Sequence, residues 1–400
     1  MERTAQTLLD LAERVLAPTY RRPPVVFTRG EGVYVYDAQG RRYLDFVAGI
    51  AVCALGHADP GVAAVVAEQA RCLVHLSNLY HTEPHLRLAE ALVARSFADR
   101  VFFCNSGAEA VEAALKFARK YARVRFGGHK VGFVAFTHGF HGRTMGTLSV
   151  TEKAAYREPF APLVPGVTFA PFNDVEAARA AITEETCAVI VEPIQGEGGV
   201  HVATLEFLQA LRERCDAVGA LLIFDEVQCG LGRTGTLWAY EAYGVEPDLL
   251  TVAKPLANGL PIGAVLMREP VAAVLQPSDH GSTFAGGPLV AAVALHVFRR
   301  LSDPAFLARV REVGAFLRAR LEAAGLPGVR AIRGRGLFLG IEIAGDARAV
   351  VAAALERGLL VTTAGDTVVR LVPPLIVTEA QIEEAIALLK AAMEAAGSSR

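Results

Sequence analysis

The lysine at position 254 is the side chain in this sequence that is best placed to act as an amine nucleophile. It follows the apolar run Leu249–Ala253 and precedes the small, turn-forming residues 255–263. A lysine at the end of a buried strand is poorly solvated, and its amine can be reached from a concave site. A solvated lysine at a strand end is the alternative, so the function of Lys254 depends on its surroundings.

Lysine is scarce in this chain, and the other lysines can therefore be considered one by one. They are expected on helices or in turns and loops, at Lys116, Lys120, Lys130, Lys153 and Lys390. Only Lys254 closes a predicted buried strand.

A carboxylate is predicted close to that amine. The apolar run Leu221–Phe224 ends at Asp225, and in open α/β sheets ligands bind at the carboxyl ends of the strands. A carboxylate in this place can keep a ring nitrogen protonated, or it can ligate a metal together with Glu192. The residues after Glu192 include no histidine before His201, and we therefore expect no metal.

An anion site is predicted at a helix start. Ser106 and Gly107 begin a predicted helix, whose free N–H groups and positive dipole end favour a phosphate. Ser106 acting only as a helix cap is the alternative. A Gly-rich turn carries Phe140 and Arg143, which would supply a ring-stacking face and a carboxylate clamp, although an exposed loop is equally compatible. Arg370 ends a β-like run and contributes only if that end faces the site.

A dinucleotide site is the competing interpretation. Residues 230–235 match Gly-x-Gly-x-x-Gly directly after a strand, which would indicate an NAD-dependent dehydrogenase. The match is weak, because no helix is predicted at Gly235 and Asp248 begins the next strand instead of ending it.

Composition and charge narrow the function classes. The content is 52% hydrophobic and 20% charged, and the net charge is −2. These values are typical of a globular protein and give no electrostatic reason to expect nucleic acid or an anionic membrane as a partner. No apolar run approaches the ~18 residues of a membrane span. The six cysteines are scattered without a Cys-x-x-Cys pair, which favours reduced thiols and a cytoplasmic location.

The predicted elements place the candidate side chains on an α/β fold. Helices are predicted at 2–16, 61–73, 83–96, 107–122, 174–182, 204–218 and 287–301. Seven apolar runs stand between them: Val101–Cys104, Val131–Phe136, Val167–Ala170, Ala188–Val191, Leu221–Phe224, Leu249–Ala253 and Ala264–Met267. Continuous apolar runs that alternate with helices predict a mostly parallel seven-stranded sheet covered on both faces.

A smaller α+β unit is predicted from both chain ends. Residues 25–46 partly alternate between apolar and polar around turns, which predicts an antiparallel meander. Beyond residue 305 we expect the elements helix 305–324, strands 329–332 and 337–343, a helix, a strand ending near 370 and a last helix from about 379. The predicted organisation is an N-terminal segment (1–60) that belongs partly to the small domain, a large domain (61–302) and a C-terminal small domain (303–400).

Six motifs occur in the order typical of one family. They are Asn105-Ser-Gly-Ala-Glu-Ala, Phe140-His-Gly-Arg-Thr, Val191-Glu-Pro-Ile-Gln-Gly-Glu-Gly-Gly, Phe224-Asp-Glu-Val-Gln, Ala253-Lys-Pro-Leu-Ala-Asn-Gly-Leu-Pro-Ile-Gly and His280-Gly-Ser-Thr-Phe. From about Tyr20 to Pro374 the chain resembles the class III aminotransferases, which have fold type I and use pyridoxal 5'-phosphate. Residues 46–57 and 77–80 are most similar to the branch of this family that acts on N-acetylornithine.

The resemblance implies a role for each matching residue. Lys254 would hold the cofactor covalently and act as general base, and Asp225 would pair with its ring nitrogen. The other implied cofactor contacts are Ser106, Gly107, Ala108, Phe140, Val227, Gln228 and Thr283. Thr283 would come from the second subunit of a homodimer.

The resemblance also implies the substrates. N-acetylornithine and 2-oxoglutarate would give N-acetylglutamate 5-semialdehyde and glutamate, a step of arginine biosynthesis. Arg143, with Tyr20 and Ser282, would hold the donor, and Arg370 would hold the dicarboxylate. Glu197 would pair with Arg370 while the ω-amine is bound and move away for the dicarboxylate.

Other activities stay open at this point. Succinylornithine, ornithine, 4-aminobutyrate or a carrier-bound lysine are alternative amine donors, and an aminomutase or a non-catalytic binding protein of the same fold are further alternatives. Two residues depart from the family pattern: Cys53 and Val111 each stand where an asparagine is usual. Cys53 leaves the details of the substrate pocket open.

Overall fold

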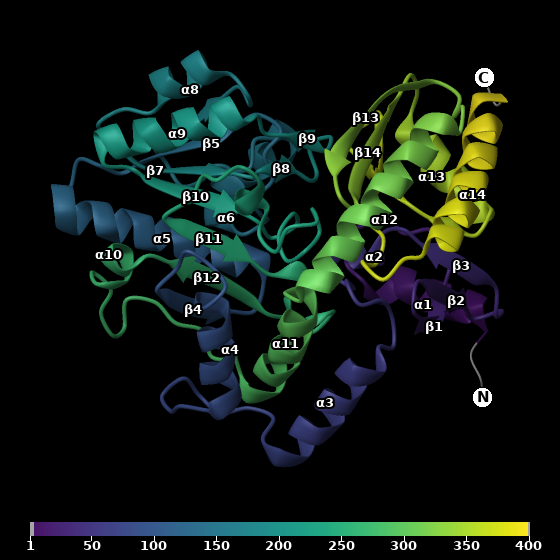
Figure 1. Cartoon of the computed structure of the whole chain (residues 1–400), viewed down its shortest axis with the longest axis horizontal. Helices are drawn as coiled ribbons and strands as arrows, with labels where there is room; N and C mark the ends of the chain where they lie inside the picture. Colours follow the sequence, from purple (N-terminus) through teal and green to yellow (C-terminus); the bar gives the residue numbers. More distant parts are fainter. Residues whose placement is uncertain (1–3, 399–400) are drawn as a thin grey trace.

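A seven-stranded sheet forms the centre of the computed structural model, which describes residues 4–398 (Figure 1). Its strand order is β4-β12-β11-β10-β7-β5-β6. The strands are β4 (Arg100–Cys104), β5 (Gly132–Phe136), β6 (Val167–Ala170), β7 (Thr186–Val191), β10 (Leu221–Asp225), β11 (Leu249–Val252) and β12 (Gly263–Met267). Only β12 runs antiparallel to its neighbours. The predicted mostly parallel sheet is therefore confirmed, with all seven runs in it.

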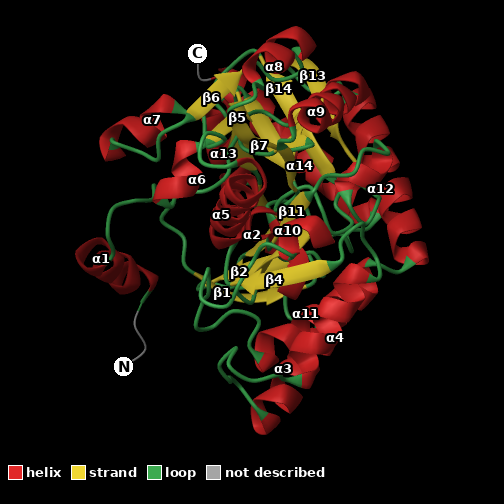
Figure 2. Cartoon of the chain, turned by 90° about the vertical axis from the view of Figure 1, so that its left-hand side faces the viewer, coloured by secondary structure: helices red, strands yellow, loops and turns green. Residues whose placement is uncertain are grey.

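Helices cover both faces of this sheet (Figure 2). On one face, α5 packs on alternate strand residues such as Ile190 and Ile223. On the other face, α9 packs on the residues between them, such as Val189 and Leu222. Burial on both sides explains why the strands are continuously apolar. The helices of this part are α3 (Pro60–Cys72), α4 (Glu83–Val93), α5 (Gly107–Phe126), α8 (Val175–Ala181), α9 (Leu205–Val218) and α11 (Pro288–Leu301).

Segments from the N-terminal and C-terminal parts of the chain together form a second part of the molecule, on the right in Figure 1. The N-terminal meander is β1 (Phe27–Glu31), β2 (Tyr34–Asp37) and β3 (Arg42–Asp45), and β3 also pairs in parallel with β15 (Leu359–Leu360). A separate sheet has the order β13-β14-β17-β16. Its strands and the helices beside it are β13 (Val329–Arg335), β14 (Phe338–Ile343), β16 (Thr362–Ala364), β17 (Val368–Leu371), α12 (Pro304–Ala323), α13 (Ala347–Glu356) and α14 (Glu379–Ser398).

The elements that the sequence did not predict are short. A few residues leave too little periodicity to recognise. They are α2 (Ala48–Ala51), α6 (Met145–Ser149), α7 (Ala154–Arg157), α10 (Glu269–Ala272), β8 (Ile194–Gln195), β9 (His201–Val202), β15 and β16, and the 3₁₀ turns η1 (Glu158–Phe160), η2 (Ala239–Ala242) and η3 (Lys254–Ala257). The predicted N-terminal helix is α1 (Ala5–Val15). Within residues 4–398, no helix is long and apolar enough to cross a membrane.

Lys130 differs most from its sequence-based expectation. It lies in a turn, as expected, but its side chain is buried. Its Nζ donates hydrogen bonds to the carbonyl oxygens of Glu184 (2.8 Å), Thr186 (3.1 Å) and Val218 (2.7 Å). Burial lowers the pKa of Lys130, and nearby Glu184 partly opposes the shift. The amine therefore joins the starts of β5 and β7 to the end of α9.

Replacing Lys130 by methionine should destabilise the fold strongly. Three buried carbonyl groups would lose their donor, and each such loss costs about 1–3 kcal/mol. We expect the free energy of unfolding to fall by at least about 3 kcal/mol, measured by urea denaturation. Lys390→Met is the matched control, because Lys390 is exposed and donates one hydrogen bond, to the Ala324 carbonyl. Equal urea midpoints for the two variants would contradict the assigned role.

Candidate active site

A cavity of about 430 Å³ lies where β10 and β11 end and α5 begins. This position, at the carboxyl ends of parallel strands, is where α/β sheets bind ligands. The cavity has the size of a small-molecule site. The predicted site residues that line it are Ser106, Gly107, Ala108, Phe140, Arg143, Asp225, Val227, Gln228 and Lys254.

Lys254 begins the 3₁₀ turn η3 directly after β11 and is half-buried. Within residues 4–398, its Nζ has no hydrogen-bond or ion-pair partner. Burial lowers the pKa of Lys254 below that of a free lysine, although the carboxylate of Glu197 partly opposes this shift. The neutral amine is therefore more populated near neutral pH than in a solvated lysine.

Asp225 is buried at the end of β10, one strand away from Lys254. Its Oδ2 lies 2.8 Å from Nδ1 of His141. Its Oδ1 accepts hydrogen bonds from the Val227 backbone N–H (3.1 Å) and the Thr251 hydroxyl (3.2 Å). These three partners fix the carboxylate beside the cavity.

His141 is a site residue that the sequence did not reveal. It is buried and lines the same cavity. It belongs to the turn that also carries Phe140 and Arg143, and this was the only signal in the sequence. Its partner Asp225 is 84 residues away in the chain, so no local pattern indicated the contact.

The start of α5 forms another part of the cavity wall. The Ser106 hydroxyl accepts a hydrogen bond from the Glu109 N–H (3.1 Å) and so caps the helix. A Cβ on Gly107 would lie 2.7 Å from Cγ1 of Val227, and this position therefore requires glycine. The first N–H groups of an α-helix have no partner within the helix and attract anions.

Arg370 and Glu197 meet beside the cavity without lining it, and Arg370 contacts Gln228 in the cavity wall. Arg370 is 1% exposed, and its Nη1 lies 2.7 Å from Oε1 of Glu197. The same nitrogen donates to Oε1 of Gln228 and to the carbonyl of Gly196, both at 2.9 Å. Burial raises the pKa of Glu197, but the charge and hydrogen bond of Arg370 outweigh burial and lower it overall. The carboxylate therefore stays charged at neutral pH.

Arg143 is exposed at the mouth of the cavity. Its Cζ lies 3.5 Å from the ring centroid of Tyr156 and 5.6 Å from that of Phe140. A guanidinium held against aromatic rings has a defined orientation and keeps its edge N–H groups available for a carboxylate.

Five predicted site residues do not line this cavity: Tyr20, Glu197, Ser282, Thr283 and Arg370. Tyr20 is 73% exposed. Thr283 is also exposed, and the Ser282 hydroxyl accepts a hydrogen bond (2.8 Å) from the Asn105 side chain. Asn105 directly precedes α5. Residues 282–283 therefore lie near the start of α5 in the same chain, but they do not reach into the cavity.

Glu192 and Glu226 are buried acids near the site. Burial raises the pKa of Glu192 to about 7, with His141 opposing the shift and Asp225 adding to it. Its oxygens accept hydrogen bonds from the N–H groups of Phe140 (2.9 Å) and Gly196 (3.0 Å). Burial raises the pKa of Glu226 to about 8. Glu192 therefore fixes the loop that presents Phe140.

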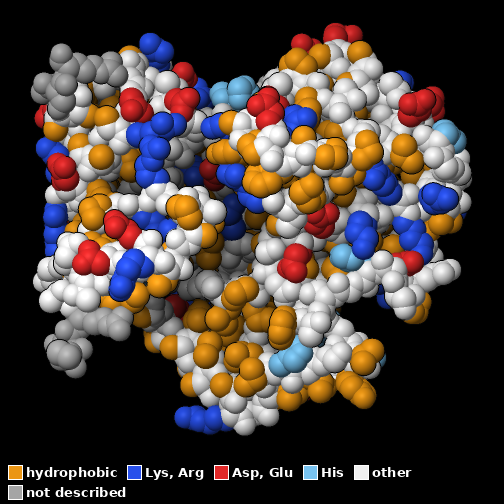
Figure 3. All heavy atoms as spheres, turned by 180° about the vertical axis from the view of Figure 1, so that it is seen from behind, with side chains coloured by type: hydrophobic (Ala, Val, Ile, Leu, Met, Phe, Trp, Pro, Cys, Tyr) orange, Lys and Arg blue, Asp and Glu red, His pale blue; other side chains and the backbone are white. Residues whose placement is uncertain are grey.

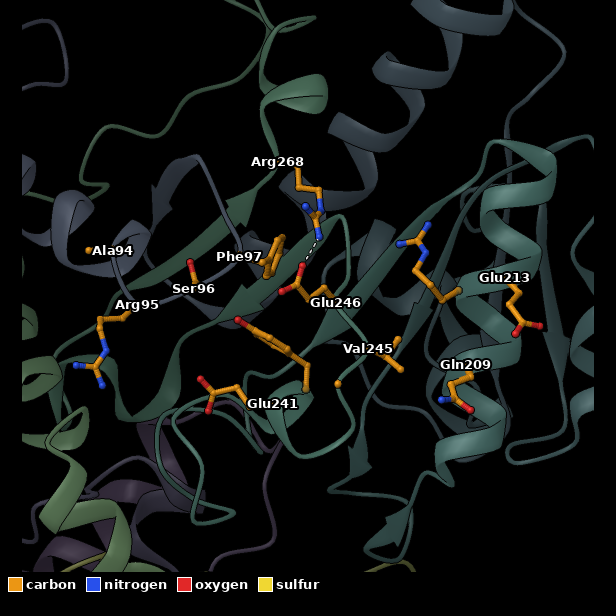
Figure 4. Close-up of a pocket in the computed structure, with 13 residues that line it drawn as sticks. Ala94, Arg95, Ser96, Phe97, Gln209, Glu213, Glu241, Val245, Glu246 and Arg268 are labelled. Carbon is orange, nitrogen blue, oxygen red and sulfur yellow. Dashed lines mark hydrogen bonds and ion pairs between the residues drawn. The ribbon is translucent and has the colours of Figure 1, made fainter.

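A larger cavity, of about 1000 Å³, lies elsewhere on the molecule (Figure 4). Its wall carries both charge signs, and Nη2 of Arg268 is paired with Oε2 of Glu246 at 2.5 Å. It includes neither Lys254 nor Asp225. The smaller cavity is therefore the one that brings together an amine, a carboxylate and a helix start.

Comparison with known proteins identifies the family. The model of the family "Aminotransferase class-III" matches residues 15–393. The chain belongs to this family. It is thus an aminotransferase, and a dehydrogenase is excluded: residues 230–235 form turns without the helix that a dinucleotide motif requires.

Individual relatives agree with this assignment. This chain is 54% identical to mitochondrial acetylornithine aminotransferase of Alnus glutinosa. The match covers 96% of this chain and 87% of the relative. The structure of N-acetylornithine aminotransferase from Stenotrophomonas maltophilia matches with TM-score 0.84 and 40% identity over 98% and 100% of the two chains. Ornithine aminotransferase from Toxoplasma gondii, whose structure shows partial occupancy of pyridoxal phosphate, matches with TM-score 0.94 and 33% identity over 99% and 95%.

Pyridoxal phosphate, the cofactor of class-III aminotransferases, fits the residues of this cavity. The start of α5 suits its phosphate. Val227 packs directly against Gly107. The buried Asp225 suits a protonated ring nitrogen. Phe140 and Val227 supply apolar surfaces for a ring. The half-buried amine of Lys254 suits an aldehyde.

Proposed function

We propose that this enzyme transfers the δ-amino group of N-acetylornithine to 2-oxoglutarate and gives N-acetylglutamate 5-semialdehyde and glutamate, as in arginine biosynthesis. The observation that carries the proposal is the Glu197–Arg370 pair at 2.7 Å, which contacts the cavity wall through Gln228. A second arginine, Arg143, lies at the mouth of the cavity. The amine that reacts in N-acetylornithine is far from the α-carboxylate. Such a donor needs a cation at a distance to bind its carboxylate, and any cation beside the reacting carbon must be neutralised by a partner. The names of relatives at 45–54% identity favour the same substrate.

The chemistry divides between the cofactor and the chain. Bound pyridoxal phosphate supplies the electron sink that stabilises a carbanion. Asp225, fixed by His141 and Thr251, would keep the ring nitrogen protonated. Nζ of Lys254, whose pKa burial lowers, would remove the proton from the carbon that bears the substrate amine.

The substrates would be oriented by the two arginines. Arg143, stacked on Tyr156, would bind the α-carboxylate of N-acetylornithine at the mouth, with Tyr20 and Ser282 assisting. Arg370 would bind a carboxylate of 2-oxoglutarate after Glu197 has moved away. While the apolar chain of the amine donor is bound beside Arg370, the arginine needs the charged carboxylate of Glu197 as its partner, because an unpaired buried arginine is unfavourable.

Replacing Glu197 by alanine should weaken the discrimination between donors. We expect kcat/KM for N-acetylornithine divided by kcat/KM for glutamate to fall about tenfold, since Arg370 would stay available for an α-carboxylate. Steady-state assays with each donor measure the ratio. Glu197→Gln separates charge from shape, and it should behave like the alanine variant. An unchanged ratio in both variants would rule out the gate.

A panel of amine donors tests the substrate assignment. N-acetylornithine, succinylornithine, ornithine and 4-aminobutyrate should be compared with 2-oxoglutarate as acceptor. We expect the highest kcat/KM with N-acetylornithine, and bleaching of the bound cofactor's visible absorbance by this donor until 2-oxoglutarate restores it. Ornithine is the second candidate, because an ornithine aminotransferase matches with TM-score 0.95. A higher kcat/KM with ornithine would favour that activity.

A homodimer is part of the proposal. Apolar side chains gather on the lower lobe in Figure 3, around α3, α4 and α11. Leu79, Tyr80 and Phe284 in this region are 84%, 66% and 68% exposed. Apolar patches of this kind mark protein interfaces. A second copy seated there would bring Thr283 to the partner's cofactor site, and sedimentation velocity should show a dimer.

The domain boundaries also remain a proposal, with an N-terminal segment (1–60), a large domain (61–302) and a small domain (303–400). The pairing of β3 with β15 supports a small domain built from both chain ends. A cytoplasmic location is proposed from the six cysteines, which are all free.

A further inference from the structure

The loop formed by residues 196–200, which carries Glu197, contacts an arginine that the proposed reaction does not use. Nε and Nη2 of Arg333 donate hydrogen bonds to the Gly199 carbonyl, at 3.2 and 3.0 Å. Arg333 belongs to β13 and is half-buried. The planar guanidinium has a fixed donor geometry, so two bonds to one carbonyl hold that carbonyl in a defined place. The backbone is therefore fixed close to the carboxylate that pairs with Arg370.

Arg333 and Arg370 lie in one row across the sheet β13-β14-β17-β16. Gly340 of the middle strand β14 is directly opposite Arg333 of β13 on one side and Arg370 of β17 on the other. Residues directly opposite one another in antiparallel strands point to the same face of the sheet. Both arginine side chains therefore lie on the face that the loop 196–200 covers.

The glycine between the two arginines lets the loop approach this sheet closely. A Cβ on Gly340 would lie 2.8 Å from Cβ of Val200, which is fully buried. Arg370 donates to the carbonyl at the start of the loop, and Arg333 donates to the carbonyl just before Val200. The loop thus crosses the sheet at Gly340 and is held by an arginine on each side.

Glu342, on the same face of β14 as Gly340, orients Arg333. Nη1 of Arg333 forms an ion pair with Oε2 of Glu342. This hydrogen bond lowers the pKa of Glu342, although burial opposes the shift. The carboxylate of Glu342 therefore stays charged at neutral pH and occupies Nη1, while Nε and Nη2 remain directed to the loop.

Glu197 has room to move without a movement of the loop. It lines a cavity of about 300 Å³ beside the cofactor cavity, and Phe140 lines both. The side chain of Glu197 is 33% exposed, whereas that of Arg370 is 1% exposed. Rotation of the Glu197 side chain can therefore free Arg370 for a substrate carboxylate, provided that the backbone of the loop stays in place.

An anchor that only stabilises the fold is the alternative role for Arg333. It would account for the hydrogen bonds and for the ion pair with Glu342. Loss of such an anchor would lower the free energy of unfolding and reduce the turnover of every substrate by the same factor. It gives no reason for Arg333 to share a row and a face with Arg370. The two interpretations differ in whether loss of Arg333 changes the preference between substrates.

We propose that Arg333 is a positioning residue for the exchange of partners at Arg370, an inference that rests on the proposed function. Arg333 holds the loop, so that only the Glu197 side chain leaves Arg370 for the dicarboxylate and returns for the ω-amine donor. Without this anchor the Glu197–Arg370 pair would be less populated. Arg370 would then be open to an α-carboxylate at the stage when the amine donor should bind.

The first test measures substrate preference in Arg333→Gln. We expect kcat/KM for N-acetylornithine divided by kcat/KM for glutamate to fall about three- to tenfold. Arg318→Gln is the matched control, because Arg318 also donates to backbone carbonyls, those of Ile332 (3.0 Å) and Gly334 (2.8 Å), both within β13. Its ratio should equal that of the unmodified enzyme. Equal ratios in the two variants would contradict the proposal.

Glu342→Gln is a milder variant that keeps Arg333 and the shape of its partner. It removes the charge that orients the guanidinium, and the same ratio should fall about twofold. Circular dichroism checks the fold of each variant. If Arg333→Gln does not fold, Glu342→Gln decides the question, because an unchanged ratio there would overturn the role of the Arg333–Glu342 pair.

The second test combines Arg333→Gln with Glu197→Ala. If Arg333 acts through Glu197, the double variant should have the ratio of Glu197→Ala alone, because no carboxylate is left to position. A further fall would show that Arg333 acts independently and would overturn the inference. An unchanged ratio in Glu197→Ala would reject the exchange at Arg370 itself, and this inference with it. A fall in Glu197→Ala but not in Arg333→Gln would reject only the inference.

Hydrogen–deuterium exchange follows the loop without any substrate. In protein loaded with pyridoxal phosphate, peptides that cover residues 194–202 should exchange at least about threefold faster in Arg333→Gln than in Arg318→Gln. The Gly196 N–H, which donates to Glu192 at 3.0 Å, belongs to these peptides and reports the position of the loop. Equal exchange in the two variants would contradict the anchoring of the loop, whichever amine donor the enzyme uses.

Discussion

Replacing Lys254 by alanine should reduce kcat by about 10⁴-fold, the upper end of the range for loss of one general base. The expected loss is large because, among residues 4–398, Lys254 is the only lysine that lines the cavity, and these residues offer no second amine there to move the proton. The free energy of unfolding should change by less than about 1 kcal/mol, since Nζ has no hydrogen-bond or ion-pair partner in the described part of the chain. Steady-state assays and urea denaturation measure the two quantities.

The control for this variant is Lys390→Ala, far from the cavity, which should keep full activity. The pH profile of the unmodified enzyme gives a second check. Because burial lowers the pKa of Lys254, the neutral amine predominates at a lower pH than in free lysine, and kcat should rise to its plateau at a correspondingly lower pH. More than about 1% residual activity in the alanine variant would show that another group moves the proton.

Replacing Asp225 by asparagine should reduce kcat by about 10²–10³-fold, the usual effect of removing one preorganised electrostatic group. Asparagine has the same shape and can still accept the hydrogen bond from the Thr251 hydroxyl. It lacks the negative charge that would keep a ring nitrogen protonated. The variant should still bind pyridoxal phosphate, as measured by absorbance, so that the loss appears in kcat and not only in cofactor affinity.

Asp248→Asn is the matched control for this variant. Asp248 lies at the opposite edge of the same sheet and pairs with Arg212 at 2.8 Å, where it also accepts the Leu222 N–H. Its replacement should lower stability and leave kcat nearly unchanged. Equal losses of kcat in the two variants would mean that Asp225 acts only through the fold.

The sequence predicted the sheet and the large helices well because each is long enough to show its periodicity. It also placed Lys254 and Asp225 together for a sound reason. Both follow buried strands, and β10 and β11 are parallel neighbours, so their carboxyl ends meet at one edge.

Contacts between distant side chains could not be predicted in the same way. His141 faces Asp225 across 84 residues, and Lys130 reaches three carbonyl groups whose positions depend on how β5, β7 and α9 pack. The left-handed turn at residues 48–51 was also missed. Its alanine and isoleucine residues favour ordinary backbone angles, and only Asp45 and the surrounding fold impose the others.

The pairing of β3 with β15 has a consequence for synthesis of the chain. Close to this pairing, the Arg41 side chain donates a hydrogen bond to the Glu356 carbonyl. These two residues are 315 residues apart in the chain. At about 5–20 residues per second, a ribosome needs roughly 15–60 s to make that stretch. During this time β3 is an unpaired edge, which in other proteins favours aggregation. The large domain can fold in the interval, and the smaller unit is completed only when the last quarter of the chain has emerged.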